Sequence, residues 1–161
     1  MDSDVSGRAQ PEARLAGHLL TLLGDRDIAA LSAELSPLVH STDPARRGLY
    51  GGVLSWLVTA LADVVVARLG TRDDDESYLL EMHTTAGRTL GIGDLPTRDG
   101  RVQRSVLALL AGDRAAARTQ LAAAEKEPEP VLRARTLVEA LVWLDAVLNT
   151  DMPVFPDPPP R

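Results

Sequence analysis

The stretch from Val53 to Leu69 is apolar on almost every face of the helix that it predicts. Its polar interruptions are Ser55, Thr59, Asp63 and Arg68. A helix that is apolar all round lies at the centre of a helical bundle or crosses a membrane. A crossing needs an unbroken apolar run of about 18–20 residues, and a carboxylate inside such a run is costly. Because Asp63 interrupts this run, the sequence predicts a central core helix and no membrane association.

Local start and stop signals place this core helix at 44–69. Asp43-Pro44, a capping residue before a first-turn proline, starts it, and Gly70 ends it. The same signals, with apolar residues at helical spacing, predict about seven helices in all. These helices span about 10–24, 25–40, 44–69, 73–90, 98–111, 113–125 and 130–149. Asp25 is predicted to cap the second helix, and residues 91–96 are predicted to form a loop.

Composition supports one all-α domain. The 161 residues include 26 Leu, 22 Ala and 16 Arg, which are among the best helix formers, and this length suits a single domain. We expect a helical domain over residues 10–149. A flexible tail is expected at 1–9 and an extended, Pro-rich tail at 150–161.

The helix breaks after Leu23, Leu69 and Ala111 resemble one another. At each, an apolar residue precedes Gly, then Asp or Thr, then Arg, at spacings of 46 and 42 residues. Such periods occur in helical repeat arrays, so the chain is expected to form either a short α-solenoid of three hairpins plus a closing helix, or an irregular bundle. The irregular bundle needs no repetition, because Gly commonly ends helices and Asp or Thr commonly starts them.

The third hairpin carries a family pattern over residues 104–128. Its pattern residues are Gly112, Asp113, Ala117, Leu121, Ala124 and Pro128. This segment resembles the second helix of a tetratricopeptide repeat, whose small residues let paired helices pack closely. Arg104 and Ser105 stand where that family favours Leu and Gly. The resemblance implies repeat-like packing and, by analogy, a scaffold role, and it carries over no binding residues.

Charge and cysteine content exclude several function classes. A net charge of −6 and a pI near 5.0 argue against nucleic-acid binding, which needs a basic surface. With no Cys, the chain has no disulfides, cysteine nucleophiles or thiolate metal sites.

The acidic start, Met1 to Asp4, is followed by no apolar signal segment, which predicts a cytoplasmic protein. One Lys against sixteen Arg indicates GC-rich coding and therefore a bacterial source.

A polar stripe on the core helix is the first candidate site. Ser55, Thr59 and Asp63 recur at every fourth position, so they share a helix face. On a solvated face they are only its polar edge, whereas in a cavity Asp63 would be a buried carboxylate, which is typical of functional sites. The residues predicted to line an apolar ligand pocket between the helices at 44–69 and 73–90 are Asp63, Tyr50, Trp56 and His83.

No set of metal ligands is predicted. The acidic cluster at 73–76 is consecutive across a predicted helix start, where carboxylates complement the helix dipole. His18, His40 and His83 lie on different predicted helices without metal-ligand spacing. We therefore expect no metal and no cofactor.

Residues 151–161 carry five prolines, which predict an extended, polyproline-like segment. Met152, Val154 and Phe155, the only phenylalanine of the chain, are its apolar anchors and the predicted partner-binding residues. Such a segment binds a groove at low entropic cost. Alternatively, it folds back over its own bundle.

These features favour a noncatalytic protein–protein interaction or regulatory module, with a protein partner or a homodimer, because no catalytic constellation is visible. The alternative is a small-molecule-binding helical domain with an apolar pocket. A third hypothesis is an enzyme whose acid–base groups come from Asp63, His83 or the 73–76 cluster.

Overall fold

The computed structural model describes residues 5–70, 78, 80–83 and 86–151, with side chains from residue 11 onward. The α-helices in this part of the chain are α1 (Val5–Gly24), α2 (Ile28–His40), α3 (Pro44–Leu69), α4 (Arg101–Leu110), α5 (Arg114–Glu125) and α6 (Pro130–Asn149). Between α3 and α4 lie a two-stranded antiparallel hairpin, β1 (Met82–His83) with β2 (Thr89–Leu90), and a 3₁₀ helix, η1 (Ile92–Asp94). The predicted all-α class is confirmed, with six α-helices in the described residues rather than about seven.

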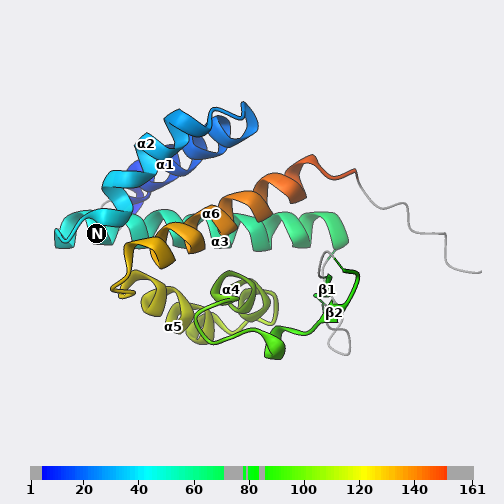
Figure 1. Ribbon diagram of the computed structural model, residues 1–161. Coiled ribbons are helices and arrows are strands. Elements are labelled where there is room, and N and C mark those ends of the chain that lie inside the picture. The colour runs from blue at the N-terminus through cyan, green and yellow to red at the C-terminus, as the bar shows by residue number, and fades with distance from the viewer. Residues whose placement is uncertain (1–4, 71–77, 79, 84–85, 152–161) are drawn as a thin grey trace, which may run out of the picture.

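The bundle is organised around α3 and α6, which run side by side in the same direction (Figure 1). The α1–α2 and α4–α5 hairpins lie on opposite sides of this pair. Helix α3 contacts every other α-helix in the described part of the chain. In a solenoid each unit contacts only its neighbours, so the predicted three-hairpin solenoid is wrong and the irregular bundle is confirmed.

Helix α3 supplies the centre of the hydrophobic core, as its apolar run predicts. Its buried residues are Tyr50, Val53, Leu54, Leu57, Val58, Leu61 and Ala62. By length and composition alone α3 would also suffice to cross a membrane, a test that the core helices of globular proteins pass as well. Asp43 caps α3 and Gly70 follows its last residue, as the sequence predicts.

The two helical hairpins turn with the same backbone geometry. Arg26 and Gly112 adopt the left-handed conformation, with φ of 58° and 78°. Asp27 and Asp113 follow and cap the next helix, each accepting a hydrogen bond from the N–H three residues later, at 3.0 and 2.9 Å. The two turns are therefore equivalent at an offset of 86 residues.

The same offset relates the starts of the third helices in the two halves. Pro44 is the first residue of α3 and Pro130 is the first residue of α6. Seven pairs of buried positions also correspond across the halves. Pairs buried in both halves are Ala16 with Val102, Leu19 with Ser105, Leu31 with Ala117, Leu38 with Ala124, Tyr50 with Thr136, Leu54 with Ala140 and Val58 with Leu144. Helix starts, hairpin turns and these buried pairs thus correspond at one offset between two three-helix units, which we define as α1–α3 and α4–α6.

Two arginines join these units by reciprocal contacts. Arg47 on α3 donates from Nη1 to the carbonyl of Glu125, at the end of α5, at 3.0 Å. Arg133 on α6 donates from Nε to the carbonyl of Val39, near the end of α2, at 2.9 Å. The two arginines are 86 residues apart, and so are the two carbonyls. The units are therefore joined at corresponding positions.

The predicted spacing of three repeats at 46 and 42 residues is therefore wrong. Gly24 is the last residue of α1 rather than the left-handed turn residue. Gly70 ends α3 with φ of 82°, and no helix follows it in residues 78, 80–83 and 86–91. Only Gly112 lies in a helical hairpin turn at its left-handed position.

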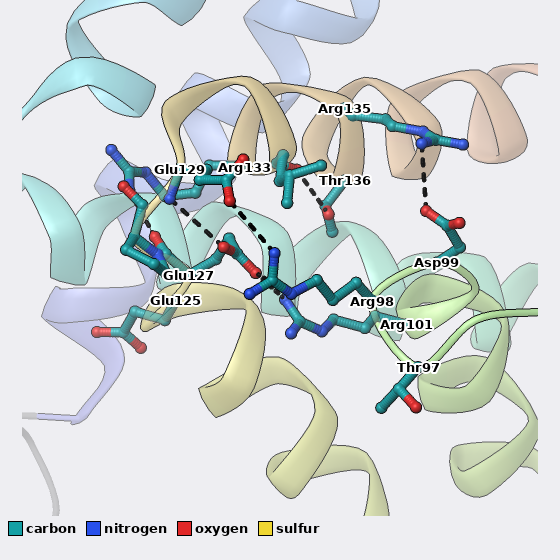
Figure 2. Close-up of polar contacts among 12 residues, drawn as sticks. Thr97, Arg98, Asp99, Arg101, Glu125, Glu127, Glu129, Arg133, Arg135 and Thr136 are labelled. Carbon is teal, nitrogen blue, oxygen red and sulfur yellow. Dashed lines mark hydrogen bonds and ion pairs between the residues drawn. The ribbon is translucent and has the colours of Figure 1, made fainter.

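A polar cluster ties α4 to the connection between α5 and α6 (Figure 2). The carboxylate of Glu127, only 3 % exposed, lies 3.2 Å from Arg101 Nη1 and 3.9 Å from Arg98 Nε. Arg98 also pairs with Glu129 at 3.3 Å. Beside them, burial and the nearby Arg47 charge lower the pKa of the Arg133 guanidinium. The cluster holds the start of α6 in place.

The structure of the segment after α3 shows that the predicted helix at 73–90 is wrong. Met82 pairs with Leu90 and His83 with Thr89 in the β hairpin. The threonines at 84, 85 and 89 and the glycine at 87 all disfavour helix, and Gly87 adopts φ of 79°. The predicted acidic cluster at 73–76 lies outside the described residues.

Two other predicted helix starts also shift. Helix α1 begins at Val5 and runs through Pro11, whereas the proline predicted a start near residue 10. Asp27 rather than Asp25 caps α2, because Asp25 and Arg26 complete the turn.

Candidate ligand pocket

A hollow of about 230 Å³ opens between α3, α4 and α6, and residues 78 and 80 form one wall. The apolar side chains that line it are Leu61, Val65, Leu69, Leu80, Val102, Val106, Leu107, Leu110, Trp143 and Val147. Among the described lining residues, the side chains that carry a polar atom are Gln103, Tyr78 and, through its indole nitrogen, Trp143. A concave, mostly apolar site with few polar groups is the usual form of a small-molecule pocket.

Gln103 is the unusual member of this lining, because its amide is buried. The residue is 4 % exposed, and its Nε2 donates to Oε1 of Glu139 on α6 at 2.5 Å. Its Oε1 is buried and accepts no hydrogen bond from any described residue. A buried acceptor without a donor costs about 1–3 kcal/mol. This side chain of the pocket wall therefore carries a buried acceptor without a donor among the described residues.

Two aromatic residues shape the rest of the hollow. Tyr78 Oη donates to the carbonyl of Gly70 at 2.5 Å, which holds this part of the wall against the end of α3. Trp143 is half-buried at the edge of the core. Because Trp56 is the only other tryptophan and does not line the hollow, Trp143 is a natural reporter for the pocket.

The four residues predicted to share a pocket do not meet in this hollow. Tyr50 is fully buried in the core, and its hydroxyl donates to the carbonyl of Arg133 at 3.0 Å. Burial raises the pKa of the Tyr50 phenol, while the Arg133 charge opposes that shift. Trp56 is half-buried against the core. Both residues support packing rather than the pocket.

Asp63 is exposed, so the hypothesis of a buried carboxylate is wrong. It lies with Ser55 and Thr59 on one wall of a second, wider groove of about 450 Å³ between α3, α4 and α5. Arg114 and Arg118 stand on the α5 side of this groove. The predicted stripe is therefore the polar edge of an open groove.

His83 lies on the surface of the β hairpin. Its ring contacts the Thr89 hydroxyl at 3.3 Å and Glu81 at 4.0 Å.

Among the described residues, no group of three His, Cys, Asp or Glu side chains is placed to hold a metal. Met152, Val154 and Phe155 lie outside the described residues.

Gln103 and Trp143 are not among the site residues predicted from the sequence. One sequence feature could have indicated the burial of Gln103. This residue directly follows Val102, which with Val106 at helical spacing predicts a buried face of α4. Its burial depends on α6 covering that position. Of the two segments predicted to line a pocket, 44–69 contributes Leu61, Val65 and Leu69 to the hollow and 73–90 contributes Tyr78 and Leu80.

Comparison with protein-family models, with curated proteins and with solved structures finds no match to this chain. The resemblance of residues 104–128 to a tetratricopeptide hairpin therefore rests on the sequence pattern alone. Helices α4 and α5 do pack together as a helical hairpin. That packing alone does not indicate a function, because helical hairpins serve many.

Proposed function

We propose that this protein is a noncatalytic helical domain that binds a small apolar molecule in the hollow between α3, α4 and α6. The ligand carries one N–H or O–H donor for Gln103. The observation that carries the proposal is the buried, unpaired Oε1 of Gln103 in an otherwise apolar wall.

Ligand binding explains this acceptor better than a trapped water does. An ordered buried water needs two to four polar partners, and besides Gln103 the described lining side chains offer the Tyr78 hydroxyl, already bonded to Gly70, and the Trp143 indole. An apolar ligand fills the hollow and contributes its single donor at the same time. The lining has no carboxylate, imidazole or ammonium group, so it is suited to binding rather than to acid–base chemistry.

The test compares two probes that differ in one hydrogen-bond donor, 2-naphthol and 2-methoxynaphthalene. The Trp56→Phe variant leaves Trp143 as the sole indole, and its side-chain NMR resonance reports binding. We expect 2-naphthol to bind about five- to tenfold more tightly, because a hydrogen bond contributes about 1 kcal/mol.

The Gln103→Leu variant should remove this preference while still binding both probes. Gln120→Leu, on α5 and away from the hollow, is the matched control and should retain it. If neither probe moves the Trp143 resonance at millimolar concentration, the proposal is wrong.

The second candidate function is protein binding, and the groove between α3 and α5 favours it. Arg114 and Arg118 lie one helical turn apart on its wall and form no ion pair within the described residues. They complement an acidic amphipathic helix. Native mass spectrometry of gently purified protein separates the two candidates. A small added mass supports the ligand pocket, whereas a second polypeptide that is lost on Arg118→Glu supports the groove.

A further inference from the structure

A second apolar hollow lies where the C-terminal ends of α3 and α6 meet. It measures about 200 Å³ and is lined by Val65, Arg68, Leu69, Val147, Thr150 and Asp151. Leu69 is 48 % exposed, a large fraction for a leucine beside an apolar hollow. The site thus offers apolar surface that is not covered by any described residue.

Hydrogen bonds from α3 hold the chain at the rim of this hollow as it leaves α6. Arg68 donates from Nη2 to the carbonyl of Leu148 at 2.9 Å, and from Nη1 to the carbonyl of Thr150. The last described residue, Asp151, itself lines the hollow. The following residues therefore start from the edge of an apolar surface.

We infer that the segment 152–156 docks in this second hollow, with Phe155 as its anchor. Phe155 lies four positions after Asp151, and an extended chain over four positions reaches about 14 Å. The segment is Met-Pro-Val-Phe-Pro, so its side chains match the apolar walls formed by Val65, Leu69 and Val147. The two prolines lower the entropic cost of fixing it.

The docked segment competes with the ligand of the main hollow. Val65, Leu69 and Val147 line both hollows, so the two sites share one wall. Phe155 in the second hollow therefore contacts side chains that also line the first. This competition rests on the proposed function, whereas the docking itself does not.

The chain offers a direct test, because Phe155 is its only phenylalanine. Labelling the full chain with 4-fluorophenylalanine produces a single ¹⁹F resonance. We expect this resonance to differ from that of a free peptide of residues 151–161 and to show a reduced H₂O–D₂O solvent shift. A resonance that coincides with that of the free peptide overturns the inference.

Two matched variants locate the docking site. Leu69→Ser removes an apolar wall of the hollow and should return the ¹⁹F resonance to the free-peptide position. Val131→Ser changes a 75 % exposed residue at the other end of α6 and should leave the resonance unmoved. The inference is also overturned if the shifted resonance stays in place in Leu69→Ser. A shift that depends on protein concentration overturns it as well.

A separate measurement tests the competition. Phe155→Ala should tighten 2-naphthol binding about tenfold if the docked state is nine-tenths populated. If the probe binds neither protein, the proposed function fails while the ¹⁹F result still decides the docking. If it binds both equally, the competition is wrong.

Discussion

The α1–α2 and α4–α5 hairpins turn in the same way and lie on opposite sides of the α3–α6 pair (Figure 1). Residues that shape the backbone recur in both units, such as the capping aspartates 27 and 113 and the first-turn prolines 44 and 130. The amide and the indole of the candidate pocket do not recur, whereas Leu61 and Val147, at corresponding positions, both line it. Gln103 and Trp143 stand where the first unit has Gly17 and Leu57. The comparison shows that corresponding positions build the scaffold, whereas the amide and the indole of the pocket occur in one unit only.

The reciprocal arginines also differ in their surroundings. Arg133 is 1 % exposed and contacts the carbonyls of Val39, Glu127 and Pro128. Arg47 is only half-buried, and its hydrogen bonds go to the carbonyls of Glu125 and Glu127. The two corresponding arginines are therefore expected to contribute unequally to the free energy of unfolding. A lost hydrogen bond costs most where water cannot replace it.

The largest expected effect is on the free energy of unfolding, which should fall much more when Arg133 is replaced than when Arg47 is. Arg133→Met should lower the free energy of unfolding by about 3–5 kcal/mol, because it leaves several buried carbonyls without donors. Arg47→Met should cost about 1–2 kcal/mol, since water reaches the carbonyls that it exposes. Urea denaturation measures both. Equal losses would show that the two contacts are energetically equivalent despite their difference in burial.

Tyr50, which has Thr136 as its counterpart, should make the stability of the fold sensitive to alkaline pH. Its folded pKa is raised by burial, so above the ordinary value of about 10 the unfolded chain loses the proton first. Stability is then complete below about pH 10 and falls by about 1.4 kcal/mol per pH unit above it.

Denaturation at pH 9 to 11 checks this prediction with two variants. Tyr50→Phe should lose about 1 kcal/mol at pH 8, from the missing hydrogen bond to Arg133, and show a shallower alkaline decline. Tyr78→Phe, at the more exposed phenol, is the control. An unchanged slope in Tyr50→Phe contradicts the prediction.

The smallest expected effects on stability come from substitutions at the left-handed residues of the two turns, Arg26 and Gly112. Arg26→Gly should stabilise the fold by about 0.5–1 kcal/mol, because relief of the strained φ outweighs the added chain entropy of glycine. Gly112→Ala should destabilise it by a similar amount, since a Cβ there meets nothing within 4 Å and only the backbone resists. Thermal unfolding measures both changes. Arg26→Ala, which keeps the left-handed strain, is the control and should not stabilise.

Local chemistry explains which helices the sequence predicts well. The bounds of α3 and α6 follow from a proline at the first position and from helix-ending residues, and these signals act within a few residues. The second helix shows the limit of this approach. Asp25 has the same capping chemistry as Asp27, and no glycine marks Arg26 as the left-handed residue, so the local rules favour the wrong aspartate.

The segment after α3 was predicted incorrectly for a related reason. Apolar residues at helical spacing, including Tyr78 and Met82, indicate an amphipathic helix. The threonines and Gly87 that follow favour extended structure and a turn. Which tendency prevails depends on the hairpin and on the contact of Tyr78 with the end of α3, and neither is visible in a local window.

By itself, the sequence determined the all-α class, the core role of the apolar α3 and most helix ends, because helix propensity, capping and hydrophobic periodicity are local properties. The tertiary structure alone decided the contacts between units. Arg47 and Arg133 meet carbonyls 78 and 94 residues away, which no local spacing specifies. It also decided the candidate site, because the burial of Gln103 and the exposure of Asp63 depend on which helix packs over each face.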